Sequence, residues 1–152
     1  MSSGIDVHRG DDELRLVTFG LAGLAGPPPR PDGTPLGDPG HELTILTPPA
    51  AEPPEWAARA LLGAARTCAM VGRWLHPGAR LAPAGPIDGR DSALVAWGVR
   101  HEDPVEEGGP PLLLLVGVTA GEYALMRRVG TDVVLDGLLA RDGRLRTDPA
   151  RR

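Results

Sequence analysis

The sequence feature that most constrains the fold is an unbroken apolar run at residues 112–118, LLLLVGV. Gly-Pro-Pro precedes the run and Thr-Ala-Gly follows it, so turn-forming residues bound it at both ends. A run of this kind is typical of a strand that is covered on both faces. It is also far shorter than the roughly 20 residues that a membrane-spanning helix needs. We therefore expect a central strand, with Leu114 in the core, in a protein that does not cross a membrane.

Two helices should follow this strand. Thr119 stands three residues before Glu122, the spacing at which a threonine hydroxyl and a glutamate carboxylate cap the first turn of a helix reciprocally. Gly130 can close that helix in a left-handed conformation, and residues 131–132 can begin the next one. Leu135 lies on the apolar stripe of the second helix and is expected in the core. The apolar face of the first helix should comprise Leu125, Met126 and Val129.

A long amphipathic helix is predicted across residues 55–75. Apolar side chains recur there every three or four residues in two adjacent stripes, and arginines recur on the opposite side. Trp56 and Trp74 lie on the apolar side and are expected in the core. Cys68, the only cysteine, lies on the same side, which favours a buried thiol over a nucleophile. Core packing is favoured over partner binding because this apolar face is too wide to leave in water.

Three further segments have the composition and alternation of strands. They are residues 13–20, 41–47 and 92–100, and residues 79–84 are a weaker candidate. Trp97 lies on the apolar face of the strand at 92–100 and is assigned to the core. A short connection joins that strand to the central one, which favours an antiparallel hairpin over a parallel crossover. The pattern predicts a single α+β domain, with a mixed, mainly antiparallel sheet packed by one long helix and two C-terminal helices.

The domain is expected to span residues 13–140. Residues 1–12 are polar and contain two glycines, which indicates a flexible arm, and residues 141–152 form a basic tail that should fray. Residues 21–40 are dominated by glycine and proline and should form a long surface loop, with disorder favoured over function. The first residues lack the apolar segment of a secretory signal, and one cysteine excludes an internal disulfide. A cytoplasmic protein is therefore expected.

The composition excludes several classes of partner and of catalytic site. The 152 residues carry 16 basic and 20 acidic side chains, and the formal net charge of −4 disfavours general affinity for nucleic acid. The sequence contains no lysine, which excludes a P-loop nucleotide site. The histidines and the cysteine are widely spaced, and no serine stands in a nucleophile-elbow context. We therefore assign no catalytic residue, no metal site and no cofactor, and the oligomeric state stays undetermined.

The most concentrated polar feature is an acidic loop at residues 102–107, in the expected hairpin connection. It carries Glu102, Asp103, Glu106 and Glu107. Their spacing matches no calcium-loop pattern, so the simplest interpretation is a solvated charged loop. They are nevertheless the strongest candidates for a partner-binding surface, because clustered charge speeds the encounter with an oppositely charged protein and orients it.

Several segments occur in a characteristic order. They are LRLVTFG, HELTILTPP, the segment beginning PPEWAARALL, SALVAWGVR and the closing LLLLVGVTAGEYALMRRVGTDVVLDGLL. In this order they resemble the Suppressor of Fused domain in its bacterial form, over most of residues 14–139. The chain departs from the family at residues 78–79, where Gly-Ala stands in place of a common Gly-His, and at residues 26–40, which look like extra length between two strands.

The resemblance implies a binding module rather than an enzyme. Eukaryotic relatives capture a short peptide of a transcription factor against sheet edges, and bacterial relatives are often inferred to be immunity proteins that neutralise a toxin. We therefore expect a protein partner, such as a toxin encoded nearby, held by the acidic loop or by strand addition at a sheet edge. Two alternatives stay open: a regulatory domain with another partner, and a small-molecule enzyme whose site is assembled from His41, His76 and Asp91.

Overall fold

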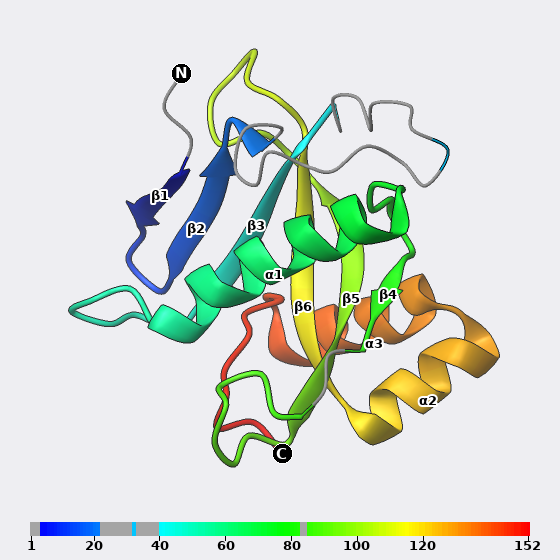
Figure 1. Ribbon diagram of the computed structural model, residues 1–152. Helices are drawn as coiled ribbons and strands as arrows, with labels where there is room; N and C mark the ends of the chain where they lie inside the picture. The colour runs from blue at the N-terminus through cyan, green and yellow to red at the C-terminus, as the bar shows by residue number, and fades with distance from the viewer. Residues whose placement is uncertain (1–3, 22–31, 33–39, 83–84) are drawn as a thin grey trace.

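The computed structural model describes residues 4–21, 32, 40–82 and 85–152 (Figure 1). The predicted loop at residues 21–40 lies almost entirely outside these ranges. Along the described chain the elements are β1 (Gly4–Arg9), β2 (Leu14–Phe19), β3 (Glu42–Thr47), α1 (Glu55–Val71), β4 (Arg80–Leu81), β5 (Leu94–Glu102), β6 (Leu112–Thr119), α2 (Ala120–Val129) and α3 (Thr131–Asp142). None of the helices in this part of the chain combines the length and the apolar composition needed to cross a bilayer.

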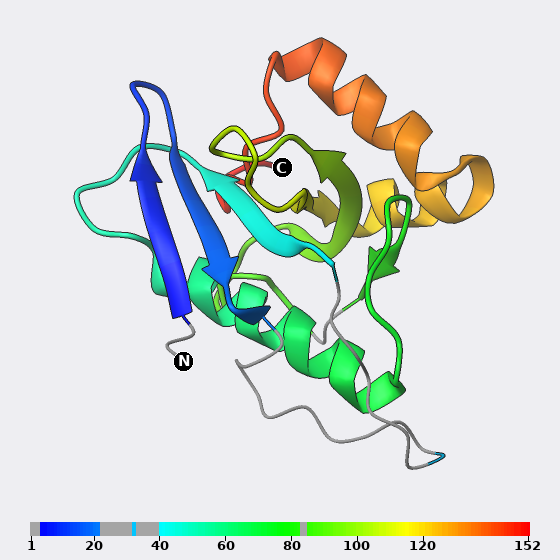
Figure 2. The ribbon, with the colours of Figure 1, turned by 90° about the horizontal axis from the view of Figure 1, so that it is seen from above.

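The described strands form one sheet in the order β1-β2-β3-β6-β5-β4. Neighbouring strands are antiparallel except for β3 and β6, whose short parallel ladder sets Glu42 beside Leu112 and Thr44 beside Leu114. Helix α1 covers one face of the sheet, and α2 and α3 lie on the other (Figure 2). The predicted fold class is therefore confirmed: a mixed, mainly antiparallel sheet packed by one long helix and two C-terminal helices.

The core has two layers that share β6. Every residue of β6 from Leu112 to Val118 is buried, because side chains from both helical layers meet this strand. Trp97 lies in the layer under α1, whereas Leu114 and Leu135 lie in the layer under α2 and α3. The other two core candidates lie nearer the surface: Trp56 and Trp74 are only partly buried and pack against the first layer.

Helix α1 ends at Val71, earlier than the predicted end at residue 75. Gly72 adopts a left-handed conformation, with φ of 72°, and its main-chain N–H donates to the carbonyl of Cys68. This glycine ends the helix before the second apolar stripe is complete. Met70, which lies within the last turn of the helix, is 76% exposed, although the stripe predicted an inward orientation. Cys68 is buried, and burial raises the pKa of its thiol.

The start of α2 has the predicted reciprocal cap. The main-chain N–H of Glu122 donates to the hydroxyl of Thr119, and the Glu122 carboxylate accepts from the Thr119 N–H at 2.8 Å. The predicted apolar face of this helix is wrong in part. Met126 is fully buried, but Leu125 and Val129 are 42% and 46% exposed. Only a narrow side of this short helix faces the sheet.

The N-terminal segment predicted to be a flexible arm forms an edge strand instead. Strand β1 pairs with β2 along its whole length, with Gly4 beside Phe19 and Arg9 beside Leu14. Its apolar residues Ile5 and Val7 alternate with polar ones, which is the pattern of a strand that faces solvent on one side. The high proportion of polar residues obscured this alternation in the sequence.

The C-terminal segment predicted to fray packs against the sheet. Leu145 and Thr147 are buried. The Thr147 N–H donates to the carbonyl of Leu46 at 2.7 Å, and its hydroxyl accepts from the Gly117 N–H at 2.9 Å. These contacts link the tail to β3 and β6. The basic composition predicted a solvated tail, but its few apolar and hydroxyl side chains are enough to anchor it.

Candidate binding surface

One face of the sheet is only partly covered by helices. Helices α2 and α3 pack over β5 and β6, and no helix among the described residues lies over the same side of β1, β2 and β3 (Figure 2). We call this half of the sheet, which no described helix covers, the open face; Val17, Thr44 and Leu46 on it are nevertheless buried. The alternation of side chains and the strand register place on it Asp6, His8, Arg15, Val17, Phe19, Glu42, Thr44 and Leu46.

The acidic loop borders the open face. It lies in the connection between β5 and β6, which form the predicted antiparallel hairpin. The main-chain N–H of Gly109 donates to the carbonyl of Glu106 at 3.0 Å and closes a tight turn in this connection. Gly108 takes a φ of 79° in the turn, a conformation that glycine adopts without strain.

The structure separates the carboxylates of the loop. Glu102 and Asp103 line one cavity, which we call the basic cavity because Arg15, Arg100 and Arg144 also line it. Glu106 lines a second one, the acidic cavity. Glu107 is exposed and lines neither of these two. The four predicted contact residues therefore do not converge on a single point, and any partner that meets all of them must span the loop.

The acidic cavity has a volume of about 220 Å³ and lies between the open face and the loop. Its walls are largely apolar and include Val17, Phe19, Val105 and Leu112. Three acidic residues line it: Asp6, Glu42 and Glu106. Apolar walls suit the methylene stem of a long cationic side chain, and carboxylates suit its charged end. The cavity can therefore accept an arginine or a lysine of a partner.

The carboxylate of Glu42, one of the residues that line this cavity, is held in a fixed position. The Thr18 hydroxyl donates to Oε2, and the main-chain N–H of Leu21 donates to Oε1 at 3.3 Å. These bonds orient the carboxylate and leave further lone pairs for a cation. Glu42 begins β3, so its position depends on the same parallel ladder that joins β3 to β6.

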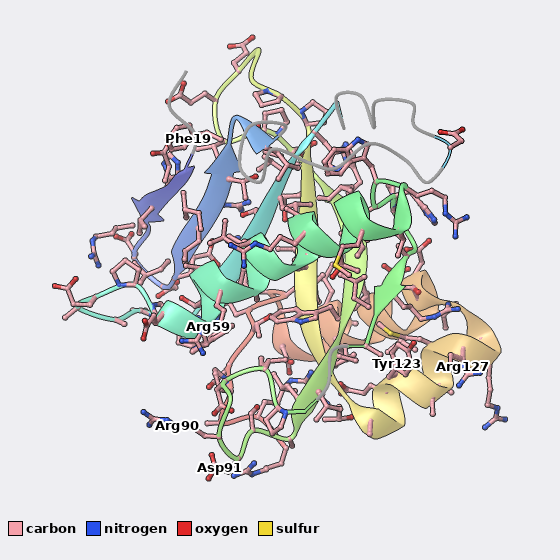
Figure 3. All side chains as sticks on the ribbon, viewed as in Figure 1. Phe19, Arg59, Arg90, Asp91, Tyr123 and Arg127 are labelled. Carbon is pink, nitrogen blue, oxygen red and sulfur yellow. The ribbon has the colours of Figure 1, made fainter. Side chains whose placement is uncertain are left out.

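A third cavity, which we call the tryptophan groove, lies on the other side of the sheet. It has a volume of about 290 Å³ and is mostly apolar. Trp56 of α1 and Trp97 of β5 line it, with their ring centroids 6.5 Å apart in a stacked arrangement. Arg59 of α1, labelled in Figure 3, also lines the groove. Trp56 is only partly buried, so part of its ring is accessible to solvent, whereas Trp97 is buried.

The residues of the enzyme alternative are not brought together. His41 precedes β3, and His76 is exposed in the turn after α1, where its Nδ1 lies 2.9 Å from the carbonyl of Pro77. Asp91 lies in the loop before β5, at the opposite end of the molecule from Phe19 of the acidic cavity (Figure 3). None of the three lines the acidic cavity, the basic cavity or the tryptophan groove. Within the described residues, no group of three or more His, Cys, Asp or Glu side chains could hold a metal ion.

Reasoning from the sequence missed the contributions of the first three strands. Asp6 and His8 belong to the segment that was assigned to a flexible arm, and Arg15 and Glu42 were treated as ordinary strand residues. A signal was present in the sequence. Polar residues at positions 6 and 8, and a lone arginine between Leu14 and Leu16, indicate a strand face that is not sealed by a helix.

The chain was compared with known families and structures. The family model described as Suppressor of fused protein (SUFU) matches residues 2–152. A structure titled "the Sufu-Fu complex crystal structure" superposes with a TM-score of 0.77 at 22% identity, covering 99% of this chain and 75% of that one. The crystal structure of Drosophila Suppressor of Fused gives 0.75 and 22%, covering 99% of this chain and 42% of that one. This chain thus spans less than half of the Drosophila chain. No curated protein matches the sequence.

Proposed function

Because the chain belongs to the Suppressor of fused protein family, we propose that it is a non-enzymatic protein that binds and sequesters a partner protein. The family resemblance seen in the sequence is thereby confirmed. One structural relative is a complex of Sufu with the partner Fu, which supports protein binding as the general role. At 22% identity this similarity supports a shared fold and does not identify the partner. The binding surface is therefore inferred from the residues of this chain.

The acidic cavity is the observation that carries the proposal. It combines an apolar wall with the carboxylates of Asp6, Glu42 and Glu106 beside the acidic loop. We place the contact there, with a basic segment of the partner lying along the open face and one cationic side chain entering the cavity. Glu107, Glu102 and Asp103 then act at longer range, because exposed carboxylates raise the rate of encounter with a basic surface.

We propose further that the partner is a toxin encoded beside this chain, which makes the protein an immunity factor in the cytoplasm of the same cell. The acidic loop supports this role in one respect: masking a basic toxin surface requires concentrated negative charge. A regulatory partner with a basic segment is the alternative, and it would use the same cavity. The identity of the neighbouring gene product distinguishes the two.

The test is a stoichiometric binding measurement with the product of the neighbouring gene. The loop variant Glu106→Gln/Glu107→Gln is compared with Glu52→Gln/Glu55→Gln, which removes the same charge from exposed positions before and at the start of α1. We expect the loop variant to bind up to roughly tenfold more weakly, because each exposed charge that attracts the partner contributes about 0.2–1 kcal/mol, whether it contacts the partner, as Glu106 does, or acts at longer range, as Glu107 does. Its affinity should also depend less on salt between about 50 and 300 mM, while the control variant behaves as the wild type.

Two results would contradict the proposal. Equal affinity and equal salt dependence of the two variants would remove the acidic loop from the contact. Failure of the wild type to bind the neighbouring gene product would remove the toxin role. In that case, recovery of a different basic protein that binds the wild type but not Glu106→Gln/Glu107→Gln would support the regulatory alternative.

A further inference from the structure

The tryptophan groove is open to solvent along its walls. Of the residues that line it, only Ala64 and Trp97 are buried. Trp56, Leu81 and Ile87 are partly buried apolar residues of the lining. A side chain that enters the groove therefore meets accessible apolar surface, and contact removes that surface from water.

Both walls of the groove are held by hydrogen bonds. Helix α1 forms one wall, and the turn at residues 86–89 contributes to the other. In this turn the main-chain N–H of Ile87 donates to the carbonyl of Leu94 at 2.9 Å, and the N–H of Gly89 donates to the carbonyl of Pro86 at 3.0 Å. The groove is therefore preformed, and binding requires little ordering of the protein.

The groove continues into a second cavity of about 520 Å³, which we call the arginine cavity because Arg59 and Arg90 line it. Trp56 and Arg59 line both spaces, so the groove and the cavity meet at these side chains. Figure 3 shows Arg59 and Arg90 at the same end of the molecule. Nη1 of Arg59 lies close to the turn, since a Cβ added at Gly89 would be 4.0 Å from it. Arg59 thus sets a positive charge at the junction between an apolar space and a more polar one.

The positive charges of the arginine cavity are more available than the negative ones. Nη2 of Arg59 lies 3.8 Å from Oε2 of Glu55, and the two side chains are 68% and 91% exposed, so water screens this pair. The Arg90 side chain is exposed and forms no ion pair with any described residue. The Asp88 carboxylate already accepts from two main-chain N–H groups, at 2.9 and 3.3 Å. Two guanidinium groups can therefore bind an anion of a partner.

We propose that the tryptophan groove and the arginine cavity together bind an extended segment of a partner protein in which an aliphatic side chain stands next to acidic residues. The aliphatic side chain lies in the groove against Trp56, and the carboxylates meet Arg59 and Arg90. Tryptophan and arginine are among the residue types that most often dominate the binding energy of protein interfaces. Arginine can also hold a carboxylate through two parallel hydrogen bonds.

The length of the groove suits such a segment. The groove follows α1 from Trp56 to Thr67, about 16 Å of helix, which matches an extended segment of about five residues. This surface lies on the side of the sheet opposite the open face and takes a ligand of opposite charge to that of the acidic cavity. The inference therefore does not rest on the proposed function.

The rival occupant is a second copy of this chain. Its acidic loop presents the exposed Val105, followed by Glu106 and Glu107. The hydrogen bond from Gly109 to Glu106 holds that loop in a tight turn. A turn fits a straight groove less well than an extended segment does, so a different protein is favoured.

Two variants of the surface are each compared with a matched control. Arg59→Gln/Arg90→Gln removes the two charges, and Arg66→Gln/Arg73→Gln removes the same charge from exposed positions outside both cavities. Gly63→Leu fills the groove, because Gly63 lines it and an added Cβ meets nothing within 4 Å. Gly137→Leu makes the same change at an exposed glycine of α3 that also has free space around it.

Binding is measured by titration of the tryptophan fluorescence with three short peptides whose ends are blocked: Gly-Leu-Asp-Glu-Gly, its neutral analogue Gly-Leu-Asn-Gln-Gly, and Gly-Gly-Asp-Glu-Gly, which lacks the aliphatic side chain. The wild type and both controls should bind the first peptide most tightly. Arg59→Gln/Arg90→Gln should bind it at least about threefold more weakly and no longer distinguish it from the neutral analogue. Gly63→Leu should lose binding.

Three results overturn the inference. The first is failure of the wild type to bind Gly-Leu-Asp-Glu-Gly more tightly than the other two peptides. The second is equal affinity of either surface variant and its control for that peptide. The third is self-association of the wild type in sedimentation without peptide that Gly63→Leu abolishes, because it assigns the groove to a second copy.

Discussion

Arg151 should hold the tail to the core through a charge-assisted contact, and its replacement by methionine tests this. Its Nη2 donates to Oε2 of Glu122 at 2.9 Å and to the carbonyl of Gly117 at 2.8 Å, and Nη1 donates to Oε1 of Glu122. The two charged side chains are only 16% and 20% exposed. Glu122 is also the residue that caps α2, so one arginine connects the tail, β6 and the start of that helix.

The size of the expected stability loss depends on the contacts that Glu122 keeps when Arg151 is replaced. A hydrogen bond to a charged group contributes roughly 1.5–3 kcal/mol, and an isolated buried charge costs about 3–5 kcal/mol. The Glu122 carboxylate keeps the bond from the Thr119 N–H and some contact with water, which places the loss toward the lower range. We expect Arg151→Met to lower the free energy of unfolding at pH 7 by about 2–3 kcal/mol, or the melting temperature by roughly 4–12 °C.

The effect should depend on pH. Burial raises the pKa of Glu122, but the hydrogen bond from Arg151, the Thr119 amide and the nearby positive charges outweigh it, and the net pKa is lowered. A carboxyl whose folded pKa lies below its unfolded pKa stabilises the protein above the unfolded value of 4.5. That stabilisation is lost as the pH falls through the folded pKa. The difference between wild type and Arg151→Met should therefore shrink below about pH 4.5.

The assay is urea unfolding followed by tryptophan fluorescence, at pH 7 and at about pH 3.5. Arg152→Met is the matched control, because this neighbouring arginine is exposed and donates only to the main-chain carbonyl of Asp91 among the described residues. Glu122→Gln completes a double-mutant cycle. A loss below about 1 kcal/mol for Arg151→Met at pH 7, or a loss that is unchanged in acid, would refute the reasoning, since either is typical of a surface pair.

Two further predictions concern packing and reactivity. An added methyl at Gly98 would lie 2.5 Å from Cε of Met126 and 3.2 Å from Leu135, so Gly98→Ala should lower the free energy of unfolding by about 1–3 kcal/mol in chemical unfolding. Gly63→Ala should raise it by about 0.5–1 kcal/mol, because a methyl added there meets nothing within 4 Å. Equal effects of the two substitutions would contradict the packing described. Cys68 should react with a thiol reagent far more slowly in the native protein than in urea, because it is buried and its pKa is raised; equal rates would contradict its burial.

The elements that could be predicted from the sequence are those whose signal is local. The run at residues 112–118 is apolar throughout and was confirmed as the central strand, and the spacing of Thr119 and Glu122 was confirmed as a reciprocal cap. Strand β1 was missed, because an edge strand buries only one side and carries few apolar residues, so the alternation at residues 5–8 is a weak signal. Its order comes from pairing with β2.

The candidate site was harder to predict for a similar reason. The acidic loop is contiguous in the sequence, and it was identified as a candidate contact. The acidic cavity, in contrast, collects Asp6, Glu42 and Glu106 from three distant segments, and only the sheet order brings them together. The basic cavity depends on the tail as well, since Arg144 and Leu145 line it from a segment that was expected to fray.

The parallel ladder between β3 and β6 has a consequence for how the protein reaches its folded state. The pairs β1–β2 and β5–β6 each close a short loop, so they can form early from neighbouring residues. The ladder has to bring Glu42 and Thr44 beside Leu112 and Leu114 across an intervening helix and two strands. Closing so long a loop costs entropy before any contact repays it. We therefore expect the docking of the two halves of the sheet at this ladder to limit the folding rate, so that substitutions at Thr44 slow refolding more than substitutions within β1 do.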